Sequence, residues 1–337
     1  MLSRVANAIY WTSRYLERAE NVSRMVYVNL HYSLENLSEN TGDWFSIIKA
    51  SGDEDFFLKK YKIHSQENII KFLITDKKNQ NSIFSCVTAA RENARTIRDI
   101  ISSKMWEDIN QMYWIVQDFV KKRSALHRPE DFLIRIQECY LAFLGAAEST
   151  MNHDEAWHFS RLGRMVERGD KTGRILDVNY FILSSNQKKE ESEPAYQALM
   201  SKSLLKSASA FEMYRQKYSD ITPEKVAHFL SESPVFPRSI YYCTHQITVS
   251  INAICTFNNH PSSEQLQEKS DRLLRMVQNK LEKKFSPQML HQFIDEFQSR
   301  LNELDSGIFE IFFSTKIPPD LFQNGSFQKQ TSGPCSA

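Results

Sequence analysis

The 337-residue sequence contains little glycine and little proline, with 9 and 10 residues respectively. Globular proteins average about 7% glycine and 5% proline, and few of the residues present here interrupt the long periodic segments. No segment alternates apolar and polar residues between hairpin turns, as a strand of a half-exposed sheet would. These absences exclude a substantial β-sheet and predict an all-α protein, a multi-helix bundle.

The sequence also lacks paired cysteines, a charge excess and a membrane-spanning apolar run. Its five cysteines are scattered and odd in number, without the close pairs that mark zinc or redox motifs. The 42 Lys and Arg residues nearly cancel the 41 Asp and Glu residues, so no overall field attracts nucleic acid or anionic membranes. No apolar run approaches the roughly 20 residues that span a bilayer. We therefore expect a cytoplasmic protein that binds neither nucleic acid nor membranes.

Familiar catalytic motifs are missing as well. There is no glycine-rich phosphate loop, no Gly-x-Ser-x-Gly elbow and no His-Glu-x-x-His pair. Glu155 and His158 have the Glu-x-x-His spacing of di-iron bundles, but that site needs a second such pair and two further carboxylates. The sequence therefore disfavours an autonomous ATPase, and we expect no metal and no cofactor.

Helical periodicity is strongest in two long segments, residues 3 to about 37 and about 152 to 184. Ser65 is the expected N-cap of a shorter helix, and Asn152 with Glu155 has the spacing of a capping box for the second long helix. Thr222 and Pro223 should open another helix. The remaining helices are predicted over residues 44–50, 54–61, 82–101, 104–122, 130–148, 238–257, 262–283 and 287–313, with Ser262 and Gln265 as a second capping box.

Composition suggests how the chain is divided. Residues 1–313 are expected to form one helical domain. The polar stretch 184–193 either separates two lobes or is a surface loop of a single domain. Residues 314–337 are expected to be a largely disordered tail.

The two long segments carry related Glu-Arg motifs. In these, Arg14, Glu17, Arg18 and Arg24 match Arg164, Glu167, Arg168 and Arg174, and Asp170 replaces Glu20. Apolar residues occupy most of the circumference of the first helix, which indicates that the helix is covered. Burial requires each charge to be paired, and we expect Glu17 to pair with Arg14, and Glu167 with Arg164, one turn away.

Small residues four apart accompany these motifs. Ala19 and Ser23, Gly169 and Gly173, and Ala90 and Ala94 are each followed by an arginine, namely Arg24, Arg174 and Arg95. Glycine inside a helix costs roughly 1 kcal/mol relative to alanine, which close helix packing would offset. We therefore expect the two Glu-Arg helices to cross tightly, with their charged side chains converging. The candidate ligand- or partner-binding residues are Arg14, Glu17, Arg18, Asn21, Arg24, Arg91, Glu92, Arg95, Arg164, Glu167, Arg168, Asp170 and Arg174, with Arg238 of Phe236–Ser239 as a further candidate.

Three interpretations of this cluster remain open. Arginine offers a fixed fork of donors to phosphate or carboxylate, so the cluster could bind an anionic ligand or partner. It could instead be a structural ion-pair network that locks a bundle. In the third interpretation, Glu17 or Glu167 acts as a general base in catalysis.

Taken together, these motifs resemble the alpha-E family of bacterial all-helical proteins, named for their Glu-Arg motif. The resemblance rests on residues 1–6, 10–11, 14–21, 90–95, 154–159, 167–168 and 236–239 and covers nearly the whole chain. Gly169 and Gly173 stand where the family more often has alanine. Members tend to be encoded beside, or fused to, circularly permuted ATP-grasp proteins and transglutaminase-like proteins.

The resemblance implies an accessory or substrate-binding subunit of an ATP-grasp-linked system that forms amide bonds or modifies peptides. Its expected partners are an ATP-grasp protein, a transglutaminase-like protein and an anionic, peptide-like ligand. The alternatives are an autonomous enzyme of amide chemistry and a purely structural helical scaffold.

Overall fold

The computed structural model describes residues 1–35, 42–122, 126, 128–185, 194–258, 263–280 and 287–314. Over these residues it contains 14 α-helices, a final π-helical turn and no strand, so the chain is all-α as predicted. The elements are α1 (Ser3–Glu35), α2 (Gly42–Ser51), α3 (Glu54–Lys60), α4 (Gln66–Ile74), α5 (Ile83–Arg95), α6 (Ser103–Lys121), α7 (Glu130–Thr150), α8 (Glu155–Ser185), α9 (Pro194–Ser207), α10 (Phe211–Lys217), α11 (Pro223–Glu232), α12 (Ile240–Asn258), α13 (Ser263–Lys280), α14 (Pro287–Ile308) and η2 (Phe309–Phe313).

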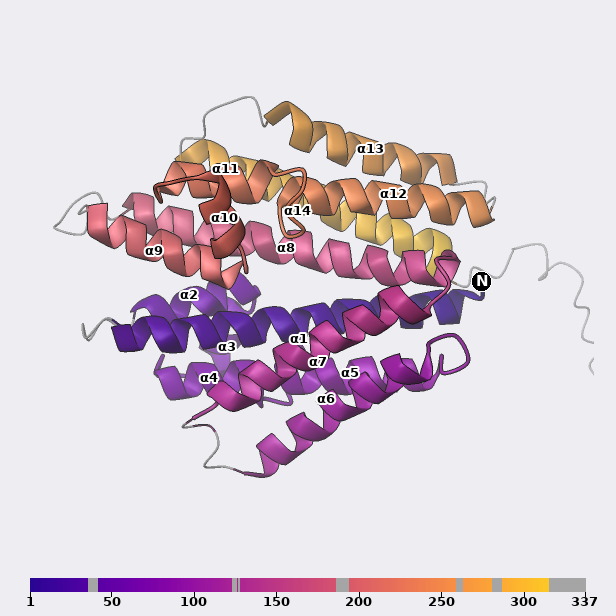
Figure 1. Ribbon diagram of the computed structural model, residues 1–337, viewed down its shortest axis with the longest axis horizontal. Coiled ribbons are helices and arrows are strands. Elements are labelled where there is room, and N and C mark those ends of the chain that lie inside the picture. Colours follow the sequence, from indigo (N-terminus) through magenta and orange to yellow (C-terminus); the bar gives the residue numbers. More distant parts are fainter. Residues whose placement is uncertain are drawn as a thin grey trace, which may run out of the picture.

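Helices α1 and α8 form the centre of the bundle and carry the two Glu-Arg motifs (Figure 1). They lie side by side and run in the same direction, since the amino group of Met1 lies 2.9 Å from Glu155 Oε2 at the first turn of α8. Helices α5 and α7 pack on α1, while α12 and α14 pack on α8 (Figure 1). Among the described residues, no helix combines the length and the apolar character that a membrane span requires.

Helix α1 is covered on almost all sides. Leu16, Ala19 and Val26 are fully buried, as the apolar periodicity predicts, but the polar face is buried too, with Glu17 and Arg24 at 0% and 4% exposure. Because an unpaired buried charge is strongly destabilising, this helix is stable only where other elements supply the opposite charges.

Several helix ends follow from local chemistry. The side chain of Ser65 accepts a hydrogen bond from the Asn68 amide, and that of Thr222 from the Lys225 amide, so both predicted helix starts are confirmed. The predicted start of the long helix at Asn152 is wrong. Helix α8 begins at Glu155, and Asp154, rather than Asn152, accepts a hydrogen bond from the Ala156 amide.

Two other predicted helices end early. The helix predicted to reach residue 101 ends at Arg95, and the last helix ends at Ile308 before the π-helical turn. Ser262 of the second capping box, most of the 184–193 linker (residues 186–193) and the tail from residue 315 lie outside the described residues.

The close approach of α1 and α8 occurs at Gly163. A Cβ atom at this position would lie 2.3 Å from the backbone oxygen of Tyr10, so any side chain would collide with the other helix. Gly169 and Gly173 were predicted to allow this contact, and that prediction is wrong. Both glycines face Phe297 of α14 instead. These two glycines lie on a different side of α8 from Gly163.

We predict that Gly163→Ala destabilises the protein by about 1–3 kcal/mol, because the new methyl group meets backbone rather than a flexible side chain. Gly145→Ala is the matched control, since nothing lies within 4 Å of a Cβ atom there. It should stabilise α7 by roughly 0.5–1 kcal/mol. Urea unfolding of both variants measures the two changes, and equal effects would contradict the proposed contact.

Candidate functional site

The two Glu-Arg motifs exchange partners across the interface between α1 and α8. Arg168 donates two hydrogen bonds to the carboxylate of Glu17, from Nε and from Nη2, both at 2.8 Å. Arg18 does the same to Glu167, at 2.6 and 2.7 Å. Each motif therefore supplies the carboxylate that binds the other motif's arginine, in the planar two-bond geometry that arginine and carboxylate favour.

The predicted pairs within each helix, Glu17 with Arg14 and Glu167 with Arg164, are therefore wrong. The two helices lie parallel with their motifs side by side, so the neighbouring helix presents a guanidinium group directly to each carboxylate. Arg14 also bonds across the interface, donating from Nε to Glu167 Oε2 at 3.1 Å. The convergence of the two motifs is as predicted, but the pairing is between helices.

Further groups hold the Glu167 side of the network. Arg14 Nη1 donates to Asp305 Oδ2 of α14 at 2.7 Å. Arg18 Nη1 donates to Asn81 Oδ1 at 2.6 Å, and the Asn81 amide in turn donates to Asp53 at 2.7 Å. Both arginines are thus fixed at several atoms.

The Glu17 side is completed by Arg238, just before α12. Its Nη1 donates to Glu17 and its Nη2 to Glu20, both at 3.0 Å. Arg24 donates to Glu20 at 2.8 Å, and the hydroxyl of Tyr140 donates to Glu17. The side-chain amide of Asn21 bonds to the Glu17 backbone oxygen, so this candidate also belongs to the network.

Both central carboxylates are held ionised. Burial by itself would raise the pKa of Glu17, but Arg168 and Arg238 lower it to about 2. Burial would likewise raise the pKa of Glu167, and Arg18 and Arg14 hold it well below its usual value. A general base works best when its pKa lies near the working pH, so this geometry does not support Glu17 or Glu167 as catalytic bases.

The two motifs differ at their first arginine. Arg14 bonds to Glu167 and Asp305, whereas Arg164, at the matching position, has no ion partner among the described residues. Its Nε is buried without a hydrogen bond, and burial lowers its pKa. Farther along α8, Arg174 donates from Nε to both oxygens of Asp170, at 3.0 and 2.9 Å.

The α5 candidates lie apart from this network. Arg91 donates to Asn110 at 2.7 Å and stacks on Tyr113, with its guanidinium carbon 4.4 Å from the ring centroid. Glu92 pairs with Arg91 and Arg95 at the surface. The structure therefore does not bring Arg91, Glu92 and Arg95 together with the Glu-Arg pairs.

A polar cavity of about 240 Å³ lies on the Glu167 side, and we term it the cationic cavity. Four cationic side chains and two acidic ones line it, with amide and hydroxyl groups between them. Its polar lining residues are Arg14, Arg18, Ser51, Asn81, Asp170, Lys171, Arg174, Asn302 and Asp305. Glu167, which binds Arg14 and Arg18, balances part of this charge, and the cations still exceed the acids by one when it is counted, so the cavity suits an anion.

Gly52 makes room for one of these cations. Its φ of +84° is a left-handed conformation that favours glycine, and a Cβ atom there would lie 3.1 Å from Arg174 Nη1. The hydrogen bonds from Arg174 to Asp170 start at Nε, so that pair leaves both terminal amino groups unused. Lys171 is anchored by a 3.1 Å bond to the backbone oxygen of Ser51.

Sequence reasoning missed Asp305, Tyr140, Asn81 and Lys171, and gave Arg238 only a minor place. Arg238 lies 221 residues from Glu17, and Asp305 lies 291 residues from Arg14. Periodicity carries no signal at such separations. The Phe-Pro-Arg-Ser segment at 236–239 was the only local sign of Arg238.

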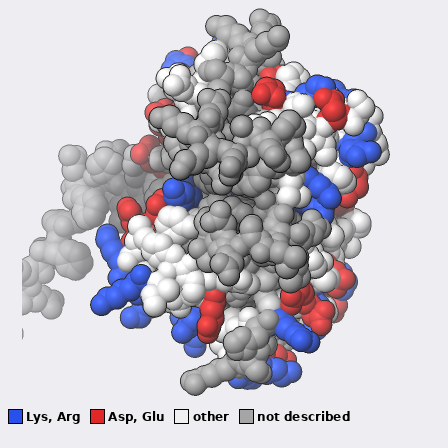
Figure 2. Space-filling model, turned by 90° about the vertical axis from the view of Figure 1, so that its left-hand side faces the viewer, with Lys and Arg blue, Asp and Glu red and all other residues white. Residues whose placement is uncertain are grey.

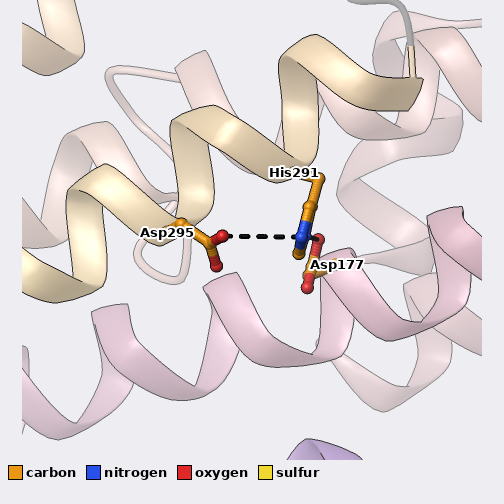
Figure 3. Close-up of side chains that lie close together, drawn as sticks. All are labelled: Asp177, His291 and Asp295. Carbon is orange, nitrogen blue, oxygen red and sulfur yellow. Dashed lines mark hydrogen bonds and ion pairs between the residues drawn. The ribbon is translucent and has the colours of Figure 1, made fainter.

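A separate cluster joins α8 to α14 at the surface, formed by Asp177, His291 and Asp295 (Figure 3). His291 Nδ1 lies 2.8 Å from Asp177 Oδ1, and its Nε2 lies 3.4 Å from Asp295 Oδ2. An imidazole and two carboxylates within 4.8 Å are a donor set that could hold a divalent metal ion. The hydrogen bond to Asp177 raises the pKa of His291, however, and the protonated ring accounts for the geometry as two ion pairs.

The surface charges are mixed. Figure 2 shows Lys and Arg interspersed with Asp and Glu around the described residues at one end of the molecule. Charged residues also gather in the interior, where Glu17, Glu167 and Arg168 of α1 and α8 are buried.

The protein thus belongs to the class of all-helical bundles. Its two central helices exchange buried glutamate–arginine pairs. The chain belongs to the Alpha-E family, described as a predicted alpha-helical domain with a conserved ER motif, whose model matches residues 1–313. It is 20% identical over 323 residues to an uncharacterized protein of Mycobacterium bovis and to uncharacterized proteins of two Mycobacterium tuberculosis strains. These matches cover 90% of the chain but only 35% of the length of each relative. No solved structure matches the chain.

We predict that acid removes a specific part of the stability. The pKa of Glu17 is about 2 in the folded protein and 4.5 in the reference state, so protons bind preferentially to the unfolded chain below pH 4.5. The contribution of Glu17 to the free energy of unfolding should therefore be fully present above about pH 4.5. Roughly 3 kcal/mol of stability should be lost through this group as the pH approaches 2. Urea unfolding at several pH values measures this loss, and a flat profile between pH 4.5 and 2 would contradict it.

We also predict that Glu17→Gln and Glu167→Gln each cost about 3–5 kcal/mol, because each leaves two arginines facing a neutral amide in the interior. Glu92→Gln is the control, since Glu92 is 46% exposed and its ion pairs lie at the surface; it should cost at most about 0.5 kcal/mol. Equal losses in all three variants would show that the buried exchange contributes no special stability.

Proposed function

We propose that this chain is an accessory, substrate-binding subunit of an ATP-grasp-linked system that forms amide bonds or modifies peptides. In this proposal the cationic cavity holds an anionic, peptide-like substrate. The observation that carries the proposal is the lining of that cavity, where Arg14, Arg18, Lys171 and Arg174 outnumber Asp170 and Asp305.

The cavity is prepared for a carboxylate before any ligand arrives. Glu167 fixes Arg14 and Arg18, and Ser51 fixes Lys171, so binding costs little side-chain ordering. Arg174 supplies two terminal amino groups outside its pair with Asp170. The amides of Asn81 and Asn302 add hydrogen-bonding groups of the kind that a peptide backbone requires.

In this proposal the ATP-grasp partner binds ATP, which accounts for the absence of a phosphate loop in the sequence of this chain. An ATP-grasp partner would activate a carboxylate as an acyl phosphate, so this chain would need only to bind and present the substrate. The association of alpha-E proteins with ATP-grasp and transglutaminase-like proteins, which the resemblance implies, supports such partners, and we place the system in the cytoplasm as part of this proposal. The mycobacterial relatives are far longer than this chain, which leaves room in those proteins for further domains.

In this proposal the Glu-Arg pairs and the cavity have different tasks. Glu17 and Glu167 are buried and fully paired, which supports a structural role for the pairs themselves. The scaffold interpretation therefore accounts for the motifs, and the binding interpretation accounts for the cavity beside them. An autonomous enzyme with a glutamate base has no support from these contacts.

The test is ADP release by the ATP-grasp protein of the same genome, with and without this chain, across a panel of amino acids and acidic peptides. We predict that the chain stimulates ADP release with an acidic peptide, and that Arg174→Gln reduces the stimulation at least tenfold at subsaturating peptide. The matched control is Arg95→Gln, since the Arg95 side chain is 63% exposed and its ion-pair partner among the described residues is Glu92 at the surface.

Two outcomes would overturn the proposal. An ATP-grasp protein that is equally active with and without this chain would exclude the accessory role. Equal effects of Arg174→Gln and Arg95→Gln would exclude the cationic cavity as the substrate site. Circular dichroism of both variants separates a loss of binding from a loss of fold.

A further inference from the structure

A second cavity, of about 370 Å³, lies beside the first and has a different character. Aromatic rings form most of its wall, and two carboxylates complete it: the lining includes Tyr10, Trp11, Phe309, Phe313, Asp305 and Glu310. We term it the aromatic cavity. It lies where α1 meets the end of α14 and the π-helical turn η2.

One ion pair separates the two cavities. Asp305 lines both of them, and Arg14, which lines the cationic cavity, donates to Asp305 at 2.7 Å. The guanidinium of Arg14 also lies 4.7 Å from the centroid of Trp11, and the hydroxyl of Tyr10 donates to Asp305. Asp305 is therefore bonded by both Arg14 and Tyr10. A ligand that extends from one cavity to the other would pass from cationic side chains to aromatic rings and a carboxylate.

The aromatic cavity has the chemistry of a cation site. Aromatic faces attract ammonium and guanidinium groups within about 6 Å of the ring centroid. The π-helical turn places Phe309 6.2 Å from Phe313 and leaves Phe309 53% exposed, so ring surface is accessible. Such turns occur frequently at functional sites. Arg14 and Arg18 together balance Glu167 and Asp305, so the remaining charge at this cavity is that of the exposed Glu310.

We propose that the ligand of this protein is dipolar, with a carboxylate in the cationic cavity and an amine in the aromatic cavity. This rests on the proposed function, to which it adds the substrate class: an amine-bearing carboxylic acid, such as an amino acid or a short peptide. The Arg14–Asp305 pair would lie beneath the segment that joins the two charged groups. A ligand of this kind carries both of the groups that amide formation joins.

The test uses three sets of simple probes in calorimetric titrations of the full chain. Straight-chain amino acids of three to eight carbons carry a carboxylate and an amine at opposite ends. Hexanoate carries the carboxylate alone, and hexylammonium carries the amine alone. We expect one length of amino acid to bind at least tenfold more tightly than either single-charge probe, and that length reports the spacing of the two subsites.

Two variants test which cavity binds the amine and which binds the carboxylate. Glu310→Gln should remove the advantage of the amino acid over hexanoate and leave hexanoate binding unchanged. Arg174→Gln should weaken both hexanoate and the amino acid. Glu303→Gln is the matched control, because Glu303 is an exposed glutamate of the same helical region that lines neither cavity, and it should change nothing.

The outcomes separate this inference from the proposed function. Amino acids that bind no more tightly than hexanoate at any length would overturn the dipolar ligand and leave the anion site intact. Failure of every carboxylate probe to bind would overturn the anion site and the dipolar ligand together. An amino-acid advantage that survives Glu310→Gln unchanged would exclude the aromatic cavity as the amine site.

Discussion

The bundle depends on the reciprocal exchange between Glu17 and Arg168 and between Arg18 and Glu167. Neither long helix could be buried alone, because each would take an unpaired carboxylate and an unpaired arginine out of water. Side by side and parallel, each helix supplies the groups that the other lacks. The close approach at Gly163 allows the short two-bond contacts, and Arg238, Asn81 and Asp305 then complete the shell.

The same exchange positions the candidate site. Glu167 uses both oxygens on Arg14 and Arg18, which turns these arginines toward a cavity that lies outside the pair. The buried carboxylates thus act through other residues, by orienting the cations that would meet a ligand. A change at Glu167 would affect both folding and binding, whereas a change at Arg174 would affect chiefly the cavity, and this difference makes the two roles separable by mutation.

Much of the fold could be predicted from the sequence because the determining signals are local. Apolar periodicity placed most of the helices, and the hydroxyls of Ser65 and Thr222 fixed two of their starts. Periodicity also indicated that the first Glu-Arg helix would be covered. The expectation that the two helices meet came from small residues four apart, but the contact is made by Gly163 rather than by Gly169 and Gly173. It could not give the partners, since helical spacing says which face of a helix is buried but not which residue lies opposite. Arg14 lies one turn from Glu17 along the chain, yet Arg168, 151 residues away, holds that carboxylate. Asp305 reaches Arg14 because α14 packs on α8, and this packing could not be read from the sequence.

The separation of the paired residues also has a consequence for synthesis of the chain. Glu17 is made 151 residues before Arg168, and at 5–20 residues per second this interval lasts roughly 8–30 s. Throughout that time α1 exists without the helix that neutralises its charges. Because burial of unpaired charges is unfavourable, α1 should stay exposed to water during this interval. Completion of α8 would then close the centre of the bundle in a late step, after the helices that follow α1 have formed.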